Sequence, residues 1–144
     1  LLLAGIWPAV PSAGEVEPMA TGLVILPCGE EIVVELAVTA SQRSRGLMFR
    51  DELPAGQGML LICPRPGFRS IWMKNCRFPL DLLLLDNSGR VVHYEQEVPP
   101  CDEEPCPNYQ SMRKVSAVLE LNAGSVDKWE IDLGDQLVVI PPLK

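Results

Sequence analysis

Histidine is nearly absent from the sequence, and its scarcity excludes many enzymatic mechanisms. The single histidine, His93, shares a predicted strand face with Glu95 and Glu97, where a lone histidine is usually exposed to solvent. The sequence also lacks a Gly-x-Ser-x-Gly nucleophile motif, a phosphate-binding loop, a His-Glu-x-x-His zinc motif and a dinucleotide-binding fingerprint. We therefore predict no cofactor and no metal site, and no motif nominates a catalytic residue.

Positive charge is scarce overall but concentrated in one segment. The chain has 12 basic and 19 acidic residues, which argues against nucleic acid as a partner because phosphate binding requires clustered Lys and Arg. Within residues 43–77, however, basic residues outnumber the acidic Asp51 and Glu52. A small anionic ligand is one interpretation of this cluster, and pairing with the acidic residues between Glu95 and Glu104 is the other. The basic residues are Arg43, Arg45, Arg50, Arg65, Arg69, Lys74 and Arg77.

Aromatic residues make up only 6% of the chain, yet the composition as a whole is that of an ordinary globular protein. A hydrophobic content of 47% and a charged content of 22% argue against both a disordered chain and a multi-span membrane protein. The sequence shows no internal repeat. A length of 144 residues leaves room for one domain, which we place at residues 31–141 and expect to be a monomer.

The chain opens with an apolar segment, Leu1–Val10, which is followed by small residues up to Gly14. This pattern is typical of the end of a signal peptide, where cleavage requires short side chains. We therefore interpret residues 1–14 as the remnant of a signal peptide and residues 15–30 as a linker that leads into the domain. The protein is then expected in the bacterial periplasm or another extracytoplasmic compartment, with no membrane span in its mature form. A retained anchor or a hydrophobic terminal strand is the alternative.

Five cysteines are an odd number, so at least one stays unpaired within the chain. Cys101 and Cys106 close a short loop among prolines, and such a turn can bring two Cα atoms within reach of a disulfide. A zinc site is the rival interpretation, but no second close pair of ligands completes it. Redox chemistry is the third, although the spacing is Cys-x4-Cys and not Cys-x2-Cys. The sequence favours a structural disulfide.

Hydrophobic periodicity predicts a mainly β (α+β) domain with two short helices. Alternating apolar residues indicate a strand over 31–38, and Thr39 is positioned to cap a helix over 40–47. Because about seven strands show no βαβ rhythm, we expect an antiparallel sheet rolled into a barrel or sandwich. The other expected elements are strands at 58–63, 68–73, 115–121 and 136–140, a hairpin of 80–85 with 90–98, and a brief helix capped by Ser125.

Several separate motifs follow one another along most of the chain. They are Ser44–Arg50 (SRGLMFR), Gly58–Leu60, Ile71–Asn75, Pro79–Asp81, and the stretch from Val98 through Cys101 to Cys106-Pro107. Their order and spacing resemble the DUF192 family. The similarity spans about residues 31–140. It implies a small β-rich fold, frequent export signals in bacteria and no established activity. One departure is Cys76, which stands where the family often has Thr, so Cys76 receives no family role.

The best candidate site combines two neighbouring segments, Trp72–Asn75 and Pro79–Asp81, with the basic motif before them. Donor-rich side chains would lie beside an aromatic wall, as in many small-molecule sites. We therefore predict a noncatalytic binding or interaction module beside the Cys101–Cys106 loop. The competing interpretation is structural, with the aromatic and methionine side chains in the core and Asp81 accepting hydrogen bonds from backbone N–H groups. The predicted ligand-binding residues are Arg45, Met48, Trp72, Lys74, Asn75 and Asp81.

Two further functions remain open from the sequence. The first is an enzyme that acts on an envelope polysaccharide or a small anion through Asp81 and Lys74. The second is periplasmic copper handling, because methionine sulfur and imidazole are suitable copper ligands. One observation distinguishes a ligand site from a structural role. A ligand site requires that Lys74 and Asp81 converge on one concave surface with Trp72. The copper candidates are Met48, Met59, Met73 and His93.

Overall fold

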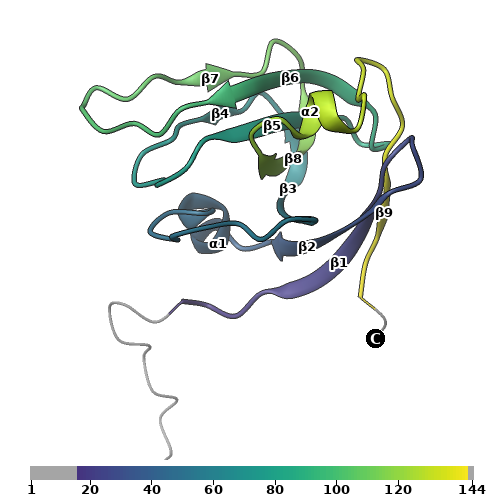
Figure 1. The fold of residues 1–144 in the computed structure, drawn as a ribbon, viewed down its shortest axis with the longest axis horizontal. Helices are drawn as coiled ribbons and strands as arrows, with labels where there is room; N and C mark the ends of the chain where they lie inside the picture. Colours follow the sequence, from purple (N-terminus) through teal and green to yellow (C-terminus); the bar gives the residue numbers. More distant parts are fainter. Residues whose placement is uncertain (1–15, 143–144) are drawn as a thin grey trace, which may run out of the picture.

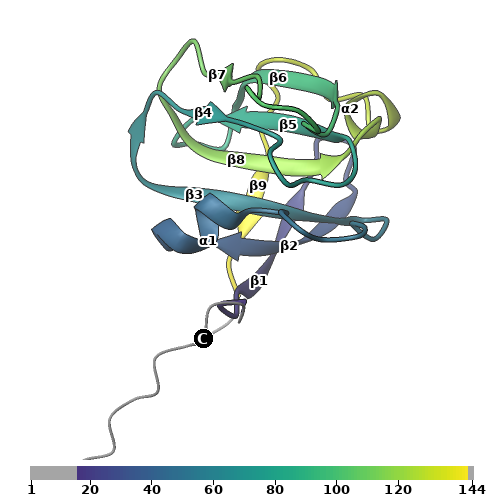
Figure 2. The same ribbon diagram turned by 90° about the vertical axis from the view of Figure 1, so that its left-hand side faces the viewer.

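The computed structural model describes residues 16–142, which form nine strands and two short helices (Figures 1 and 2). The predicted signal-peptide remnant, residues 1–14, lies outside this range. Within the described range no helix is both long and apolar enough to cross a membrane. The elements are β1 (Ala20–Ile25), β2 (Glu31–Ala37), α1 (Ala40–Arg45), β3 (Gln57–Gly67), β4 (Ser70–Ile71), β5 (Leu80–Leu85), β6 (Val91–Val98), β7 (Tyr109–Gln110), β8 (Val115–Asn122), α2 (Ser125–Lys128) and β9 (Val138–Ile140).

Seven strands form one sheet in the order β6-β5-β8-β3-β2-β1-β9, and β4 pairs with β7 in a separate two-stranded ribbon. The prediction of a wholly antiparallel sheet is wrong, because β2 and β3 run parallel. Residues 38–56, which include α1, carry the chain back to the end of the sheet where β2 began. This crossover is a short βαβ unit that the alternation pattern did not reveal.

The main sheet curls until its two edges meet at one end, but it does not close into the predicted barrel (Figure 1). The meeting point is an isolated bridge between Arg90, before β6, and Gln136, before β9. Beside it, Leu137 N donates to Gly89 O at 2.9 Å. The fold is therefore a half-barrel, with the edge strands joined at one end only.

Both faces of the sheet are covered by apolar side chains. One core cluster draws residues from strands all around the curl, so it fills the inside of the half-barrel. A second cluster lies on the outer face, beneath the crossover and the 71–78 segment. Strand β5 is covered on both faces. All six of its residues are buried, and its leucine side chains are divided between the two clusters. The predominantly apolar sequence of residues 80–85 is consistent with this burial on both faces.

Two local predictions need correction. Strand β1 lies within residues 15–30, which we predicted to be a linker, and it pairs with both β2 and β9. Ser125 does not cap α2, since Gly124 is the N-cap and the Ser125 hydroxyl donates to Asn122 O at 2.6 Å. In both places the tertiary neighbours, which a local pattern does not contain, decide the structure.

The cap of α1 is confirmed. Gln42 N donates to Thr39 Oγ1 at 3.1 Å, and Thr39 N donates to Gln42 Oε1 at 3.0 Å, which completes a reciprocal capping box. Replacing Thr39 with Ala should lower the free energy of unfolding by about 1 kcal/mol, because one N-terminal N–H of the helix loses its acceptor. Urea denaturation measures this loss. The control is Ser41→Ala, an exposed helix position, and an equal loss in that variant would contradict the assignment.

Candidate functional site

A hollow of about 320 Å³ lies over the outer face of β3 and β8. One wall is the crossover, and the other is the segment around β4. The two walls are tied together where Phe49 N donates to Asn75 O at 2.8 Å. The hollow is lined by 43–48 and 69–72, and by Leu61, Cys63, Cys76, Val118 and Glu120.

Glu120, on β8, forms part of the floor of this hollow and is only 6% exposed. Its Oε2 atom is buried and has no hydrogen-bond partner among the described residues. Burial raises the pKa of Glu120 to about 7, and the positive charge of Arg50 offsets only part of this effect. Arg50 is itself paired with Glu35. The floor of the hollow thus holds a carboxyl group whose pKa lies near neutral pH and whose Oε2 atom has no hydrogen-bond partner among the described residues.

Gly46 brings the backbone of the crossover close to Glu120. Helix α1 ends there with φ of 48°, a conformation that favours glycine. A Cβ atom at Gly46 would lie 3.6 Å from Glu120 Oε2. The Arg45-Gly46-Leu47 sequence therefore lets the chain turn directly above the carboxyl group and shield it from solvent.

Arg69 supplies a second polar atom without a partner. Its Nε is buried and unpaired among the described residues, while Nη2 donates to Arg65 O at 2.5 Å. The Arg69 backbone is held by Ser111, whose N donates to Arg69 O at 2.8 Å and whose Oγ accepts from Arg69 N at 2.7 Å. The hollow therefore contains an unsatisfied acceptor on Glu120 and an unsatisfied donor on Arg69.

Three of the six predicted ligand-binding residues line the hollow, namely Arg45, Met48 and Trp72. The Arg45 guanidinium lies 5.4 Å from the centroid of the Phe49 ring. Met48 and Trp72 provide apolar wall, and the exposure of Trp72, 45%, shows that it is not a core residue. Met48 and Trp72 are 24 positions apart in the sequence, and the fold places both of them, together with Arg45, along the same hollow.

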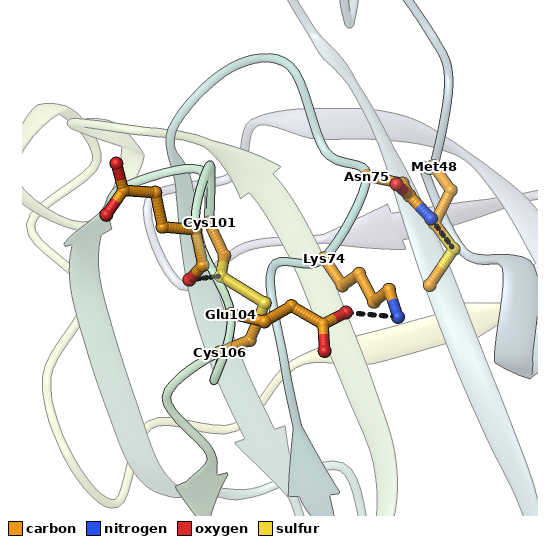
Figure 3. Close-up of polar contacts among 7 residues, drawn as sticks. Met48, Lys74, Asn75, Cys101, Glu104 and Cys106 are labelled. Atoms are coloured by element: carbon orange, nitrogen blue, oxygen red, sulfur yellow. Dashed lines mark hydrogen bonds and ion pairs between the residues drawn. A yellow bond between two sulfur atoms is a disulfide. The ribbon is translucent and has the colours of Figure 1, made fainter.

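Lys74 and Asn75 do not line the hollow, although both contact residues that do. Figure 3 shows their polar contacts. Lys74 Nζ pairs with Glu104 Oε1 at 2.5 Å and sits 5.2 Å from the centroid of the Trp72 ring. Asn75 Nδ2 approaches Met48 Sδ at 3.9 Å. Through these contacts Lys74 helps to position Trp72, and Asn75 helps to position Met48.

Asp81 takes no part in the hollow. It faces the inside of the half-barrel with Leu83, whereas Glu120 faces outward with Val118. Asp81 is fully buried, and it accepts hydrogen bonds from Glu97 N through Oδ1 and from Val126 N through Oδ2, both at 2.8 Å. The structure therefore supports the structural interpretation of Asp81, as an acceptor that joins β6 to α2.

The five cysteines comprise one disulfide pair and three free thiols, those of Cys28, Cys63 and Cys76. The disulfide between Cys101 and Cys106 is present as predicted, with a Cα–Cα distance of 5.6 Å. No group of three or more His, Cys, Asp or Glu within the described chain is arranged to hold a metal ion. Met59 and Met73 are buried in the second core cluster, so the predicted copper ligands do not converge on an open site.

The thiol of Cys76 lines the hollow but is not activated as a nucleophile. Its pKa is raised to about 11, first by burial and then by the negative charge of Glu120. A thiol with so high a pKa stays protonated at neutral pH, and the thiolate is the reactive form.

Glu120 was missed in the sequence analysis, although a signal was present. It interrupts the apolar run Ala117–Leu121, and alternation places it on the same face as Val118. In a strand that is buried on both faces, a single carboxyl group has no route to solvent. Such a residue needs a partner, a raised pKa or a ligand.

Comparisons with known proteins agree with this architecture. The sequence model of DUF192, described as an uncharacterized ACR, matches residues 24–139. The chain belongs to the DUF192 family. One solved relative, from Sinorhizobium meliloti 1021, is described as a "putative transcription regulator" and is 35% identical, with a TM-score of 0.79 over 88% of this chain and 98% of its own.

A second similar solved structure comes from Novosphingobium aromaticivorans DSM 12444 and is described as a protein of unknown function. It is 29% identical, with a TM-score of 0.73 over 93% of this chain and 94% of its own. No curated protein matches the chain. The family assignment therefore supports the fold and leaves the function to be argued from the site.

The raised pKa of Glu120 should appear as a pH-dependent stability. Between its ordinary value of 4.5 and about 7, the unfolded chain releases a proton that the folded protein retains, so the free energy of unfolding falls as pH rises. In the wild type the free energy of unfolding should fall by about 3 kcal/mol, because each unit of pKa difference contributes about 1.4 kcal/mol. Glu120→Gln should remove this fall. Denaturant unfolding at pH 4.5 and pH 8 measures the difference. Glu31→Gln, an exposed strand position, should behave like the wild type, and parallel pH profiles for all three proteins would contradict the assignment.

The structural role of Asp81 predicts a loss of stability without a loss of ligand binding. Asp81→Ala should lower the free energy of unfolding by about 3 kcal/mol, because two backbone donors lose their acceptor. Guanidinium denaturation measures this effect. Asp51→Ala, which removes an exposed ion pair with Arg77, should cost less than about 1 kcal/mol. Similar losses in the two variants would be evidence against the role of Asp81.

Proposed function

We propose that this DUF192 protein is a noncatalytic binding module for a small, hydroxylated anion in the bacterial envelope. The observation that carries the proposal is the pair of unpartnered polar atoms in one hollow, Glu120 Oε2 and Arg69 Nε. Buried polar atoms in proteins almost always have hydrogen-bond partners, and a missing partner costs about 1–3 kcal/mol. A ligand that supplies both partners would recover this cost.

The chemistry of the hollow specifies the ligand. A hydroxyl group can donate to Glu120 Oε2, and a carboxylate or phosphate can accept from Arg69 and face Arg45. The carbon skeleton would contact Met48 and Trp72. The volume, about 320 Å³, lies at the lower end of the range for ligand pockets, which favours a compound as small as a hydroxy acid or a sugar acid.

The envelope location is supported by two features of the chain. Disulfides such as Cys101–Cys106 persist mainly in oxidising compartments outside the bacterial cytoplasm. Residues 1–14 have the composition of the end of a signal peptide. A periplasmic protein that binds a small anion would meet its ligand as an external nutrient or as a fragment of envelope polymer.

The alternatives are less well supported. An enzyme that acts through Asp81 and Lys74 requires the two side chains to converge, whereas Asp81 is inside the half-barrel and Lys74 is paired with Glu104. The description of the Sinorhizobium relative suggests a regulator. Helices α1 and α2 contain six and four residues, which is short for a helix that reads the major groove, and the net charge of −7 opposes binding to DNA.

Thermal unfolding with defined probes tests the proposal. Glycerate and glucuronate should raise the Tm of the wild type, whereas acetate, which lacks hydroxyl groups, and glucose, which lacks charge, should raise it less. Glu120→Gln and Arg69→Gln should each reduce the affinity for the hydroxy acids by about tenfold or more, because each removes a charge-assisted hydrogen bond. Isothermal calorimetry measures this loss.

The matched control is Arg77→Gln, which changes an exposed arginine outside the hollow. It should bind like the wild type. Native mass spectrometry of protein purified from its own periplasm provides the second readout, with a co-purifying mass that disappears in Glu120→Gln. Equal Tm shifts in the wild type and Glu120→Gln, or an empty mass spectrum together with no Tm shift, would reject the proposal.

A further inference from the structure

The ribbon of β4 and β7 presents apolar side chains on its outer face. Ser70 pairs with Gln110, and Ile71 pairs with Tyr109. Ile71 and Tyr109 pack inward against the second core cluster, so the side chains that alternate with them point outward. The outward positions on β4 and its two flanking residues are Phe68, Ser70 and Trp72, all of which are exposed.

Phe68 and Met112 belong to the same end of this ribbon, where it joins the main sheet. Arg69 is hydrogen-bonded to Ser111 on one side of them, and Gly67 pairs with Val115 on the other. Phe68 is 65% exposed and Met112 is 79% exposed. In Figure 2 the turn from β3 into β4 and the connection from β7 to β8 lie on the same side of the molecule. We call Phe68, Met112 and the basic residues beside them, Arg65, Arg113 and Lys114, the ribbon tip.

The ribbon tip is positively charged, although the chain as a whole carries a net charge of −7. Its three basic side chains are exposed, and none of them forms an ion pair within residues 16–142. No acidic residue occurs in 53–80 or in 105–119. The acidic residues of the disulfide loop are Asp102–Glu104. They come directly after Cys101, which forms a bridge with Lys74 at the other end of the ribbon. The charge along the ribbon is therefore strongly asymmetric.

We propose that the ribbon tip docks the protein on an anionic lipid bilayer. Phe68 and Met112 would enter the boundary between headgroups and acyl chains, while the three basic side chains bind the headgroups, and the acidic disulfide loop is repelled and points away. A bilayer fits the tip better than a protein partner, because a narrow ribbon offers little of the roughly 800 Å² per partner that a stable protein interface buries. This docking is independent of the ligand proposed for the hollow.

Co-sedimentation with lipid vesicles tests the proposal on the full chain. The wild type should bind vesicles of phosphatidylglycerol and phosphatidylethanolamine in equal parts more tightly than vesicles of phosphatidylcholine, and added salt should weaken the binding. Arg113→Gln with Lys114→Gln should reduce the partition coefficient about thirtyfold, and Phe68→Ser with Met112→Ser should reduce it about tenfold or more. The apolar N-terminal segment is common to all variants, so its contribution cancels in these comparisons.

Two controls change similar side chains elsewhere on the surface. Lys128→Gln removes an exposed charge on α2, and Leu133→Ser removes an exposed apolar side chain before β9. Both control variants should bind vesicles like the wild type. If the hollow binds hydroxy acids, the control variants and the tip variants should all keep the Tm shift that these compounds produce. Unchanged partitioning of the tip variants, or equal losses in the controls, would overturn the proposal. Tighter binding of the wild type to duplex DNA or to polyaspartate than to anionic vesicles would overturn it in favour of a nucleic acid or an acidic protein.

Discussion

The parallel pairing of β2 with β3 is the constraint on which the candidate site depends. Two adjacent parallel strands cannot be joined by a tight turn, so residues 38–56 must return across the sheet. Their path lies on the outer face, where α1 ends at Gly46 directly above Glu120. If β2 and β3 formed an antiparallel hairpin, no crossover would cover β8 and Glu120 would be exposed to solvent. The hollow is thus a consequence of strand direction.

The two buried carboxyl groups show how one sheet supports different roles on its two faces. Asp81 faces the inside of the half-barrel, and each of its two carboxylate oxygens accepts a backbone hydrogen bond. Asp81 therefore stabilises the fold. Glu120 faces outward, keeps an unpartnered oxygen and has a pKa raised to about 7 by burial. A protein retains an unsatisfied buried group at a cost, and such groups concentrate at functional sites. The difference in partners, rather than in residue type, makes Glu120 the candidate for ligand binding.

Much of the local structure could be predicted because its causes are local. Alternation identified the strand at 31–37, and a short apolar run identified the strand at 80–85. The hydroxyl of Thr39 identified the start of α1. The short loop between Cys101 and Cys106 predicted their disulfide. The predictions failed where partners distant in the sequence decide the outcome. Strand β1, which we took for a linker, exists because it completes the sheet between β2 and β9.

The sequence by itself determined the family and most of the larger elements, and it nominated Arg45, Met48 and Trp72 for one site, since motif residues and hydrophobic periods are properties of the chain alone. Only the tertiary structure decided which carboxyl group belongs to that site. Asp81 and Glu120 both interrupt apolar strands, and the sequence does not state which face of the curled sheet the crossover covers. That choice follows from strand order and direction, which arise from contacts between residues far apart in the chain.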